Sequence, residues 1–213
     1  MKGYIKSILA RTAPEWALDI SGLVVQSVAV PAAAVYVASF CRGTVPNYAG
    51  VLHIPWAGTF LLNFVAVDYL YYWNHRLLHG PLWRWHAAHH TAKSMDVLIT
   101  SRNTLWTPIL IVYVWANSLF LYLLADPAPY LAAVAVSSLL DVWRHCGWNR
   151  FSGVLFVSPA DHAWHHGSNL PHENFGANFS LWDRLHGTWR GGEAPKSLGL
   201  ELEESLWKKL VMP

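Results

Sequence analysis

The distribution of histidines constrains this chain more than any other feature of its sequence. Nine histidines fall into four groups between residues 75 and 166, in the order HxxxH, HxxHH, a single histidine and HxxHH. They are His75, His79, His86, His89, His90, His145, His162, His165 and His166. Residues three or four apart on a helix share one face, so each group can point its imidazoles at a common cation. The spacing therefore predicts a metal centre.

Ligation by imidazole indicates a transition metal. Neutral imidazole suits iron, zinc, copper and nickel, whereas magnesium, calcium and manganese prefer oxygen ligands. Each HxxHH group can serve one metal or two neighbouring metals, and together the groups come close to a complete ligand set for a two-metal centre. A lone histidine such as His53 is usually a structural residue, but two copies of HxxHH are hard to obtain by chance.

The composition is too apolar for an ordinary soluble domain, with 54% hydrophobic and 13% charged residues. Apolar stretches lie at residues 18–40, 51–73, 105–125 and 128–143. The first three reach the roughly 20 residues that a membrane-spanning helix needs, and the fourth is short. Prolines just before the fourth stretch predict a tight turn, so the last two stretches should form a hairpin. We expect an all-α integral membrane protein with about four transmembrane helices in two hairpins and a histidine-rich helical cap.

Basic residues predict the orientation of these spans. On one predicted side lie Lys2, Lys6, Arg11, Arg76, Arg84, Lys93 and Arg102, whereas the opposite loops hold only Arg42. By the positive-inside rule, both termini and every histidine group face the cytoplasm, and we expect a bacterial inner membrane. The formal net charge of +2 is too small to indicate nucleic-acid binding.

We treat residues 1–213 as a single membrane-embedded domain with two peripheral segments. Residues 1–17 are predicted to be an interfacial N-terminal segment, and the run of Thr12, Ala13, Pro14 and Glu15 is typical of a helix start. Residues 198–212 alternate apolar and charged side chains at helical spacing. They predict an amphipathic helix that lies on lipid or docks a partner.

The order of the histidine groups around a membrane hairpin resembles the fatty acid hydroxylase and sterol desaturase superfamily of membrane di-iron enzymes. The resemblance covers about residues 68–189. Asn174-Phe175-Gly176 and the segment LWDRLHGT at 181–188 look like the NxG and WDRxxGT segments of that family. The resemblance implies that the nine histidines are the catalytic ligands of two iron ions, with His145 as an additional ligand between the second and third boxes.

Seven further residues are candidates for supporting the metal ligands, namely Asp68, Asp141, Asp161, His172, Asn174, Asp183 and His186. Asp68 lies inside an apolar stretch, and we expect it to accept a hydrogen bond from an imidazole or from Arg144, with a structural polar contact as the alternative. Asp141 shares a helix face with His145 and is expected to be a ligand or an orienting group.

The remaining candidates lie near the third box. Asp161 and Asp183 are expected to orient its imidazoles, and Asn174 belongs to the family-like NxG segment. His172 precedes that segment, and His186 stands where the family pattern has phenylalanine. Both could approach the metals or serve as hydrogen-bonding structure.

The resemblance implies hydroxylation or desaturation of a fatty acyl chain, sterol or related lipid that enters from the bilayer, with O₂ as co-substrate and two electrons. We favour hydroxylation because it places fewer constraints on the substrate, and desaturation stays open. Alternatives of another class are a metal transporter and a zinc-dependent hydrolase, although transporters usually hold their ligands near the bilayer midplane.

The electrons are expected from outside the chain. The sequence carries no Rossmann fingerprint, haem-attachment motif or iron–sulfur cysteine set. A separate electron carrier and reductase are therefore implied. The basic residues Arg84, Lys93 and Arg102 could receive an acidic carrier on the cytoplasmic face, and control of membrane topology is the alternative explanation for them.

Overall fold

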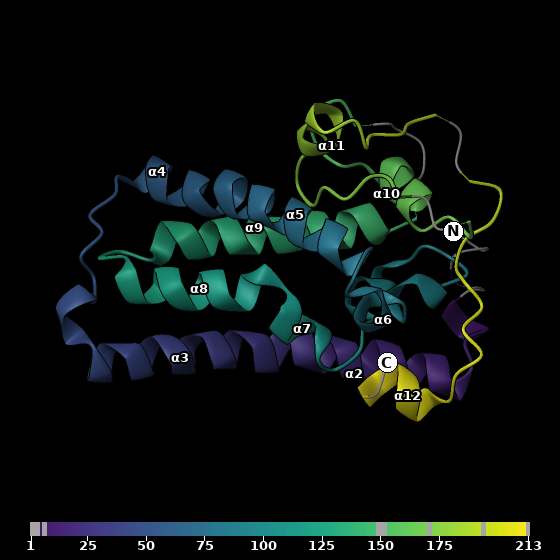
Figure 1. The fold of residues 1–213 in the computed structure, drawn as a ribbon, viewed down its shortest axis with the longest axis horizontal. Helices are drawn as coiled ribbons and strands as arrows, with labels where there is room; N and C mark the ends of the chain where they lie inside the picture. The colour runs from purple at the N-terminus through teal and green to yellow at the C-terminus, as the bar shows by residue number, and fades with distance from the viewer. Residues whose placement is uncertain (1–4, 6–7, 148–152, 170–171, 193–194, 212–213) are drawn as a thin grey trace.

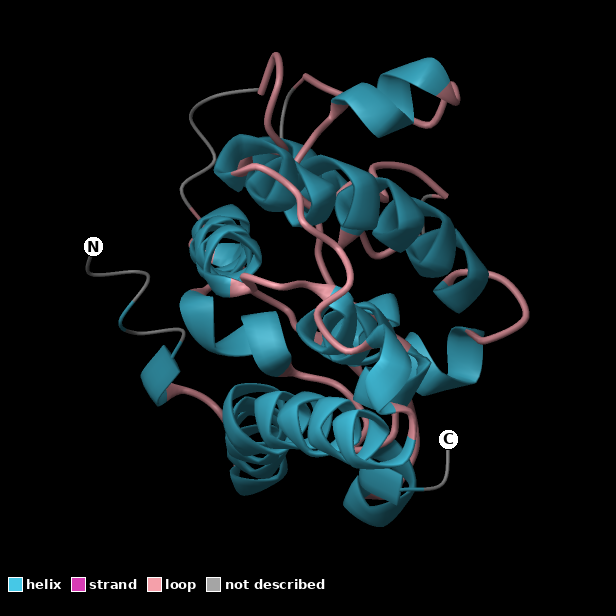
Figure 2. Cartoon of the chain, turned by 90° about the vertical axis from the view of Figure 1, so that its left-hand side faces the viewer, coloured by secondary structure: helices cyan, strands magenta, loops and turns pink. Residues whose placement is uncertain are grey.

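A computed structural model describes residues 5, 8–147, 153–169, 172–192 and 195–211. Within these ranges the regular elements are helices, and β-pairing is limited to three isolated bridges. The all-α prediction is confirmed. Long helical rods lie side by side, and shorter helices gather at one end of them, as Figure 1 shows and the end-on view of Figure 2 repeats. We call this end the cap.

The first rod joins α2 (Ala13–Val24), the π-helical segment η1 (Val25–Ala29) and α3 (Val30–Thr44). Its 32 residues form the one described helix that is long and apolar enough to cross a membrane. A capping box between Thr12 and Glu15 starts it, which confirms the predicted helix start. Residues 13–17, predicted as interfacial, therefore belong to this helix, while residues 1–4 and 6–7, with Lys2 and Lys6, lie outside the described residues.

The second rod joins α4 (Trp56–Leu61), η3 (Leu62–Val67) and α5 (Asp68–Leu78). The middle segment is again π-helical, and the backbone passes through it into α5 without leaving the helical region. This rod starts and ends five residues later than the apolar stretch at 51–73, because its last turns belong to the first histidine box.

The third apolar stretch is not one continuous helix, contrary to the prediction. It contains α7 (Thr107–Leu110) and α8 (Val112–Leu123), separated by Ile111 in an extended conformation with φ −82° and ψ 133°. Asn74 of α5 stabilises the break, because its amide donates to the Leu110 carbonyl at 2.9 Å and accepts from the Val112 N–H at 3.2 Å. Backbone groups that would be unpaired in apolar surroundings thus have partners.

The fourth rod is α9 (Ala128–His145), whose 18 residues follow the turn after α8. It extends past the predicted end of the stretch at 128–143 and carries His145 as its last residue. At the end remote from the cap, the backbone of Leu52 pairs with the segment that ends α8. This pairing ties the loop before α4 to the α8–α9 hairpin.

The cap is built from short elements. They are α6 (Trp83–His86), η4 (His89–Thr91), η5 (Val97–Ser101), α10 (Pro159–His165), α11 (Leu181–Leu185) and α12 (Leu206–Val211). The helix predicted at 198–212 is confined to α12 among the described residues, and Met212 lies outside them. The chain before α12 is not helical because Gly199 and Leu200 donate their backbone N–H groups to the carbonyls of His166 and His90.

Candidate metal centre

All nine predicted histidines are buried, and the fold brings them into two adjoining groups. The five-histidine group consists of His75, His79, His86, His90 and His165. The four-histidine group consists of His89, His145, His162 and His166. Within each group the available ring nitrogens lie within 4.8 Å of one another. Histidines that are up to 91 residues apart in the sequence, from His75 to His166, therefore lie close together at the cap end of the helical rods.

Helix ends place these side chains. His75 lies in the last turn of α5 and His79 caps it, His145 ends α9, and His166 caps α10. Each HxxHH motif divides between the two groups, since its first and last histidines enter one group and its middle histidine enters the other. The two motifs thus exchange one ligand each, because the middle histidine of each motif joins the outer pair of the other.

Backbone carbonyls fix the protonation of four imidazoles. The Nδ1 atoms of His75, His89 and His165 donate to the carbonyls of Phe175, Arg102 and Glu173, each at 2.9 Å. The Nδ1 atom of His145 donates to the Asp141 carbonyl at 2.8 Å. A carbonyl can only accept, so in the neutral rings the proton sits on Nδ1 and the lone pair on Nε2. Metal-ligating histidines characteristically use this arrangement.

The lone pairs of these rings face other imidazole nitrogens. The Nε2 atoms of His75 and His86 are 3.1 Å apart, and those of His145 and His162 are 2.9 Å apart. Nitrogens that share one metal at roughly 2.0–2.1 Å each can be at most about 4.2 Å apart. Both pairs meet this condition, and a cation between them would satisfy lone pairs that otherwise repel.

Burial supports the same chemistry. Burial lowers the pKa of His86 to about 4 and the pKa of His165 to about 3, and it also lowers the pKa of His90 well below its ordinary value. The rings are therefore neutral at pH 7, the form that binds metal. His90 has no hydrogen-bond partner on either ring nitrogen despite its burial. Its ring stacks on His166 with 4.6 Å between centroids, so the donor set fits two neighbouring transition-metal ions.

Asp183 supports the site through the backbone. Its carboxylate accepts hydrogen bonds from the N–H groups of Phe175 and Gly176 and from the Thr188 hydroxyl, each at 2.8 Å. These contacts fix the peptide whose carbonyl receives the His75 proton. Burial raises the pKa of Asp183 to about 6. The predicted orienting role thus reaches the first histidine box, rather than the third, and passes through Phe175.

Asn174 and Asp161 hold the third box in place. Asn174 adopts a positive φ of 55°, which asparagine tolerates better than most residues, and its amide donates to the carbonyls of Asp161 and Arg190. Asp161 forms a capping box with Ser158 at the start of α10. Its carboxylate therefore fixes the helix that carries His162 and makes no hydrogen bond to an imidazole.

The contacts of Asp68 and Asp141 compare differently with their predicted roles. Asp68 accepts hydrogen bonds from the Asn178 N–H at 2.8 Å and the Trp182 indole at 2.7 Å. The prediction that it accepts from an imidazole or from Arg144 is therefore wrong, and the alternative of a structural polar contact describes it. Asp141 belongs to neither histidine group. Its carboxylate lies 3.1 Å from the His145 ring and forms an ion pair with Arg144, which favours the orienting role over ligation.

His172 and His186 lie apart from the two groups in the part of the chain that the structure describes. His172 is exposed, and its ring centroid is 6.4 Å from that of His79. His186 contacts the Tyr69 hydroxyl at 3.1 Å and stacks on Tyr72. The contacts of His186 fit the hydrogen-bonding alternative better than metal contact, and the exposure of His172 distinguishes it from the buried histidines of the two groups.

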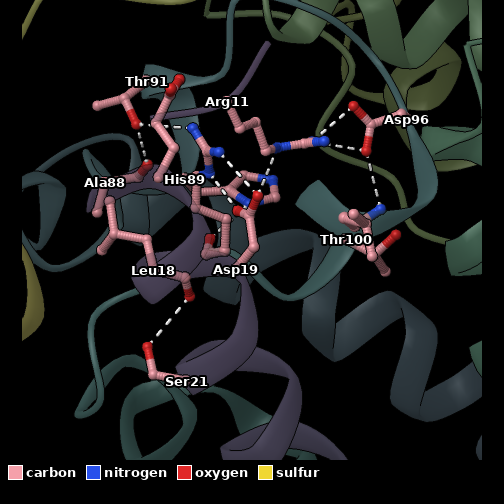
Figure 3. A network of polar contacts seen from close by, with 12 residues as sticks. Arg11, Leu18, Asp19, Ser21, Ala88, His89, Thr91, Asp96 and Thr100 are labelled. Carbon is pink, nitrogen blue, oxygen red and sulfur yellow. Dashed lines mark hydrogen bonds and ion pairs between the residues drawn. The ribbon is translucent and has the colours of Figure 1, made fainter. Parts of the chain in front are cut away.

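A buried ionic network beside His89 was not anticipated from the sequence (Figure 3). Arg102 is 1% exposed, and its guanidinium binds Asp19 of α2 at 2.5 and 2.9 Å. Arg11 joins Asp19 at 2.7 Å to Asp96 at 2.6 Å. The prediction that Arg102 belongs to an exposed carrier-binding face is therefore wrong. Asp19 inside an apolar helix was the signal that could have revealed the network.

Two cavities lead to the histidines. The first is lined by members of both groups, including His75, His86, His89, His145 and His162. The second lies between α3, α8 and α9 and is lined by Ala34, Leu121, Leu131 and Val134 among others. Gln26, Val30, Tyr113, Asp141 and Arg144 line both. The cavities therefore adjoin at these five side chains, and the second is predominantly apolar.

Comparison with known proteins agrees with this geometry. The fatty acid hydroxylase family matches residues 60–188. An ornithine lipid hydroxylase, OlsE of Rhizobium tropici, is 33% identical over 155 residues, which cover 67% of this chain and 45% of that protein. Alkylglycerol monooxygenase of Danio rerio is 30% identical over 156 residues, covering 68% of this chain and 33% of that protein. The chain spans less than half the length of these curated relatives, and no solved structure matches it with comparable significance.

Proposed function

Since the chain belongs to the fatty acid hydroxylase family, we propose that it is an integral membrane di-iron oxygenase that hydroxylates an unactivated C–H bond of a lipid. The observation that carries the proposal is the convergence of nine buried histidines into two adjoining groups. The two relatives act, by their names, on an ornithine lipid and an alkylglycerol. A fatty acyl chain, a sterol or a related lipid is accordingly the substrate class.

The five-histidine group would hold one iron ion and the four-histidine group the other. Iron bound there would supply oxygen-dependent oxidation with O₂ as co-substrate and two electrons. The carbonyls of Phe175, Arg102 and Glu173 hold the imidazoles in the tautomer that offers Nε2. Burial of all nine rings excludes bulk water from the reacting atoms.

The lipid would reach the histidines from the bilayer. The second cavity, among the rods, accepts the apolar chain, and the first cavity brings a carbon to rings of both groups. These roles follow from the side chains that line each cavity, because apolar side chains dominate the second cavity and imidazoles line the first. Binding thus positions the substrate, while the helix ends position the metal ligands.

The rods are proposed to span the membrane as four segments of one domain covering residues 1–213. Large apolar side chains point outward along them, among them Val28, Phe40, Leu61, Leu119 and Leu139. A chain this apolar on its surface is stable only against lipid or a partner. α8 covers only about 18 Å at 1.5 Å per residue, so the bilayer beside it would thin or the α8–α9 hairpin would be only partly inserted. Positive charge favours a cap and termini in the cytoplasm, at a bacterial inner membrane.

A separate electron carrier and reductase complete the proposal. Arg84 and Lys93 are exposed on the cap and could contact an acidic carrier. The cap lies at one end of the rods, whereas transporters usually keep their ligands near the midplane of the membrane. This placement favours an oxygenase over a transporter.

The test is metal analysis and Mössbauer spectroscopy on detergent-purified protein from cells grown on iron-57. About two coupled irons per chain are expected, together with lipid-dependent O₂ consumption when an electron donor is supplied. His165→Ala and His145→Ala, one from each group, should lose iron and activity. His53→Ala is the control, because His53 is exposed and distant in sequence from the boxes.

Zinc as the only metal in freshly prepared protein, with no O₂ consumption, would overturn the proposal and direct attention to hydrolysis. An unsaturated product formed with the same iron content would instead identify a desaturase on the same scaffold. Full activity in His165→Ala would show that the histidine groups are not the catalytic centre.

A further inference from the structure

The side chains that line both cavities include an unusually large number of polar groups for a region between apolar helices. Arg144 is 5% exposed and lines both cavities. Gln26, Tyr113 and Asp141 line both with it. An ionisable group among membrane-spanning helices is expensive and is usually retained for a function. We call these four residues the junction.

The Arg144 guanidinium is only partly satisfied. Its Nη1 donates to the Ala177 carbonyl at 2.7 Å, and its Nη2 lies 2.6 Å from Asp141. Its Nε is buried and has no hydrogen-bond partner. A buried donor without an acceptor costs free energy, so an acceptor oxygen delivered by a ligand would be bound favourably.

Charge decides which acceptor fits. Asp141 already pairs with Arg144, so the Arg144 side chain has no uncompensated positive charge to offer an anion. A free carboxylate would also approach the Asp141 carboxylate and would have to give up its hydration. A carbonyl oxygen accepts from Nε–H without these costs.

Resting on the proposed function, we infer that the junction binds the neutral carbonyl of an ester- or amide-linked acyl chain, and that the substrate class is therefore intact acyl lipids rather than free fatty acids. The apolar remainder of the chain would occupy the second cavity, against Leu121, Leu131 and Val134. The carbonyl at Arg144 would then anchor the lipid beside His145, the next residue along α9.

Binding can be measured without turnover. Palmitic acid, methyl palmitate, N-methyl palmitamide and hexadecane share a chain length and differ in the acceptor group. Each would compete with a spin-labelled lipid for the purified full chain in detergent, and affinities would be corrected for partition into micelles. We expect the ester and the amide to bind at least about ten-fold more tightly than hexadecane, and the ionised acid to bind less tightly than either.

Variants test whether the junction causes the preference for a carbonyl-bearing ligand over hexadecane. Arg144→Gln alone leaves Asp141 uncompensated and is prone to misfold, so the double variant Asp141→Asn with Arg144→Gln removes both charges together. It should bind hexadecane as the wild type does and lose the preference for the carbonyl. Ser138→Ala is the control, because Ser138 lines the second cavity but bonds to its own helix. It should keep the preference.

Equal binding of ester and hexadecane by the wild type would overturn the inference, with water as the occupant of the junction. Tightest binding of palmitic acid would overturn it in favour of an anion site. Iron content and O₂ consumption, measured on the same preparations, test the proposed function separately. A protein that lacks iron and still prefers the carbonyl would refute the oxygenase and leave the junction as a lipid-binding site.

Discussion

Removal of the Asp19 carboxylate should destabilise the protein strongly. In Asp19→Ala, Arg102 loses contacts of 2.5 and 2.9 Å and Arg11 loses one of 2.7 Å. Arg11 keeps Asp96, but among the described residues Arg102 keeps only the Thr91 hydroxyl at 3.5 Å, which leaves a buried cation with no carboxylate in contact with it. Breaking a buried ion pair from one side costs roughly 3–5 kcal/mol. We expect a loss of that size in the free energy of unfolding.

Unfolding in mixed micelles, followed by circular dichroism as the denaturing detergent is increased, would measure the loss. Lys93→Ala is the control, because Lys93 also bridges distant segments, to Glu201, but with side chains that are 52% and 86% exposed. An exposed pair contributes about 0–1 kcal/mol. The two variants thus compare one buried and one exposed ion pair in the same cap.

The same variant should also lose metal. The carbonyl of Arg102 accepts the Nδ1 proton of His89, so displacement of Arg102 releases that ring from the four-histidine group. Iron content should fall in Asp19→Ala and stay unchanged in Lys93→Ala. If Asp19→Ala unfolds at the same detergent concentration as Lys93→Ala and keeps its iron, the buried network does not hold α2 against the histidine boxes, and the reasoning fails.

Three further outcomes are expected. Gly22→Ala should destabilise the protein by about 1–3 kcal/mol because its Cβ would collide with a backbone carbonyl, whereas Gly43→Ala, with nothing within 4 Å, should be neutral or stabilising in the same unfolding assay. Asp183→Asn should lower iron content by weakening the peptide that orients the first box, which metal analysis would detect; unchanged content would contradict this role. Metal-free protein should lose stability as the pH falls through about 6.5, because the lowered pKa values of His86 and His165 mean that the unfolded chain takes up those protons first, whereas a thermal-melting series should become flat only above about pH 8.

The histidines that form the centre were predictable because the signal is local. Spacings of three and four residues place rings on one helix face whatever the rest of the fold does, and all nine predicted histidines enter the two groups. Their division between the groups was not predictable. It depends on how α6 and α10 approach each other, and residues 86 and 162 lie far apart in the sequence.

The supporting contacts were harder to anticipate, for a physical reason. The four acceptors that fix imidazole protons, at Phe175, Arg102, Glu173 and Asp141, are backbone carbonyls, which every residue carries. The break at Ile111 likewise depends on Asn74, a residue of another helix. Hydropathy alone reads the stretch at 105–125 as continuous because it registers apolar composition and not the long-range partner that makes a break tolerable.

The π-helical segment η3 has a consequence for how α4 and α5 are related. A π turn accommodates about one residue more than an α turn, so it shifts the angular phase of everything that follows. Asp68, His75 and His79 keep a common phase because they all follow η3. A helical wheel drawn through Trp56 to Leu78 would therefore assign α4 to the wrong face. The extra residue acts as a rotational offset between α4 and α5, the part of the rod that carries His75 and ends at His79.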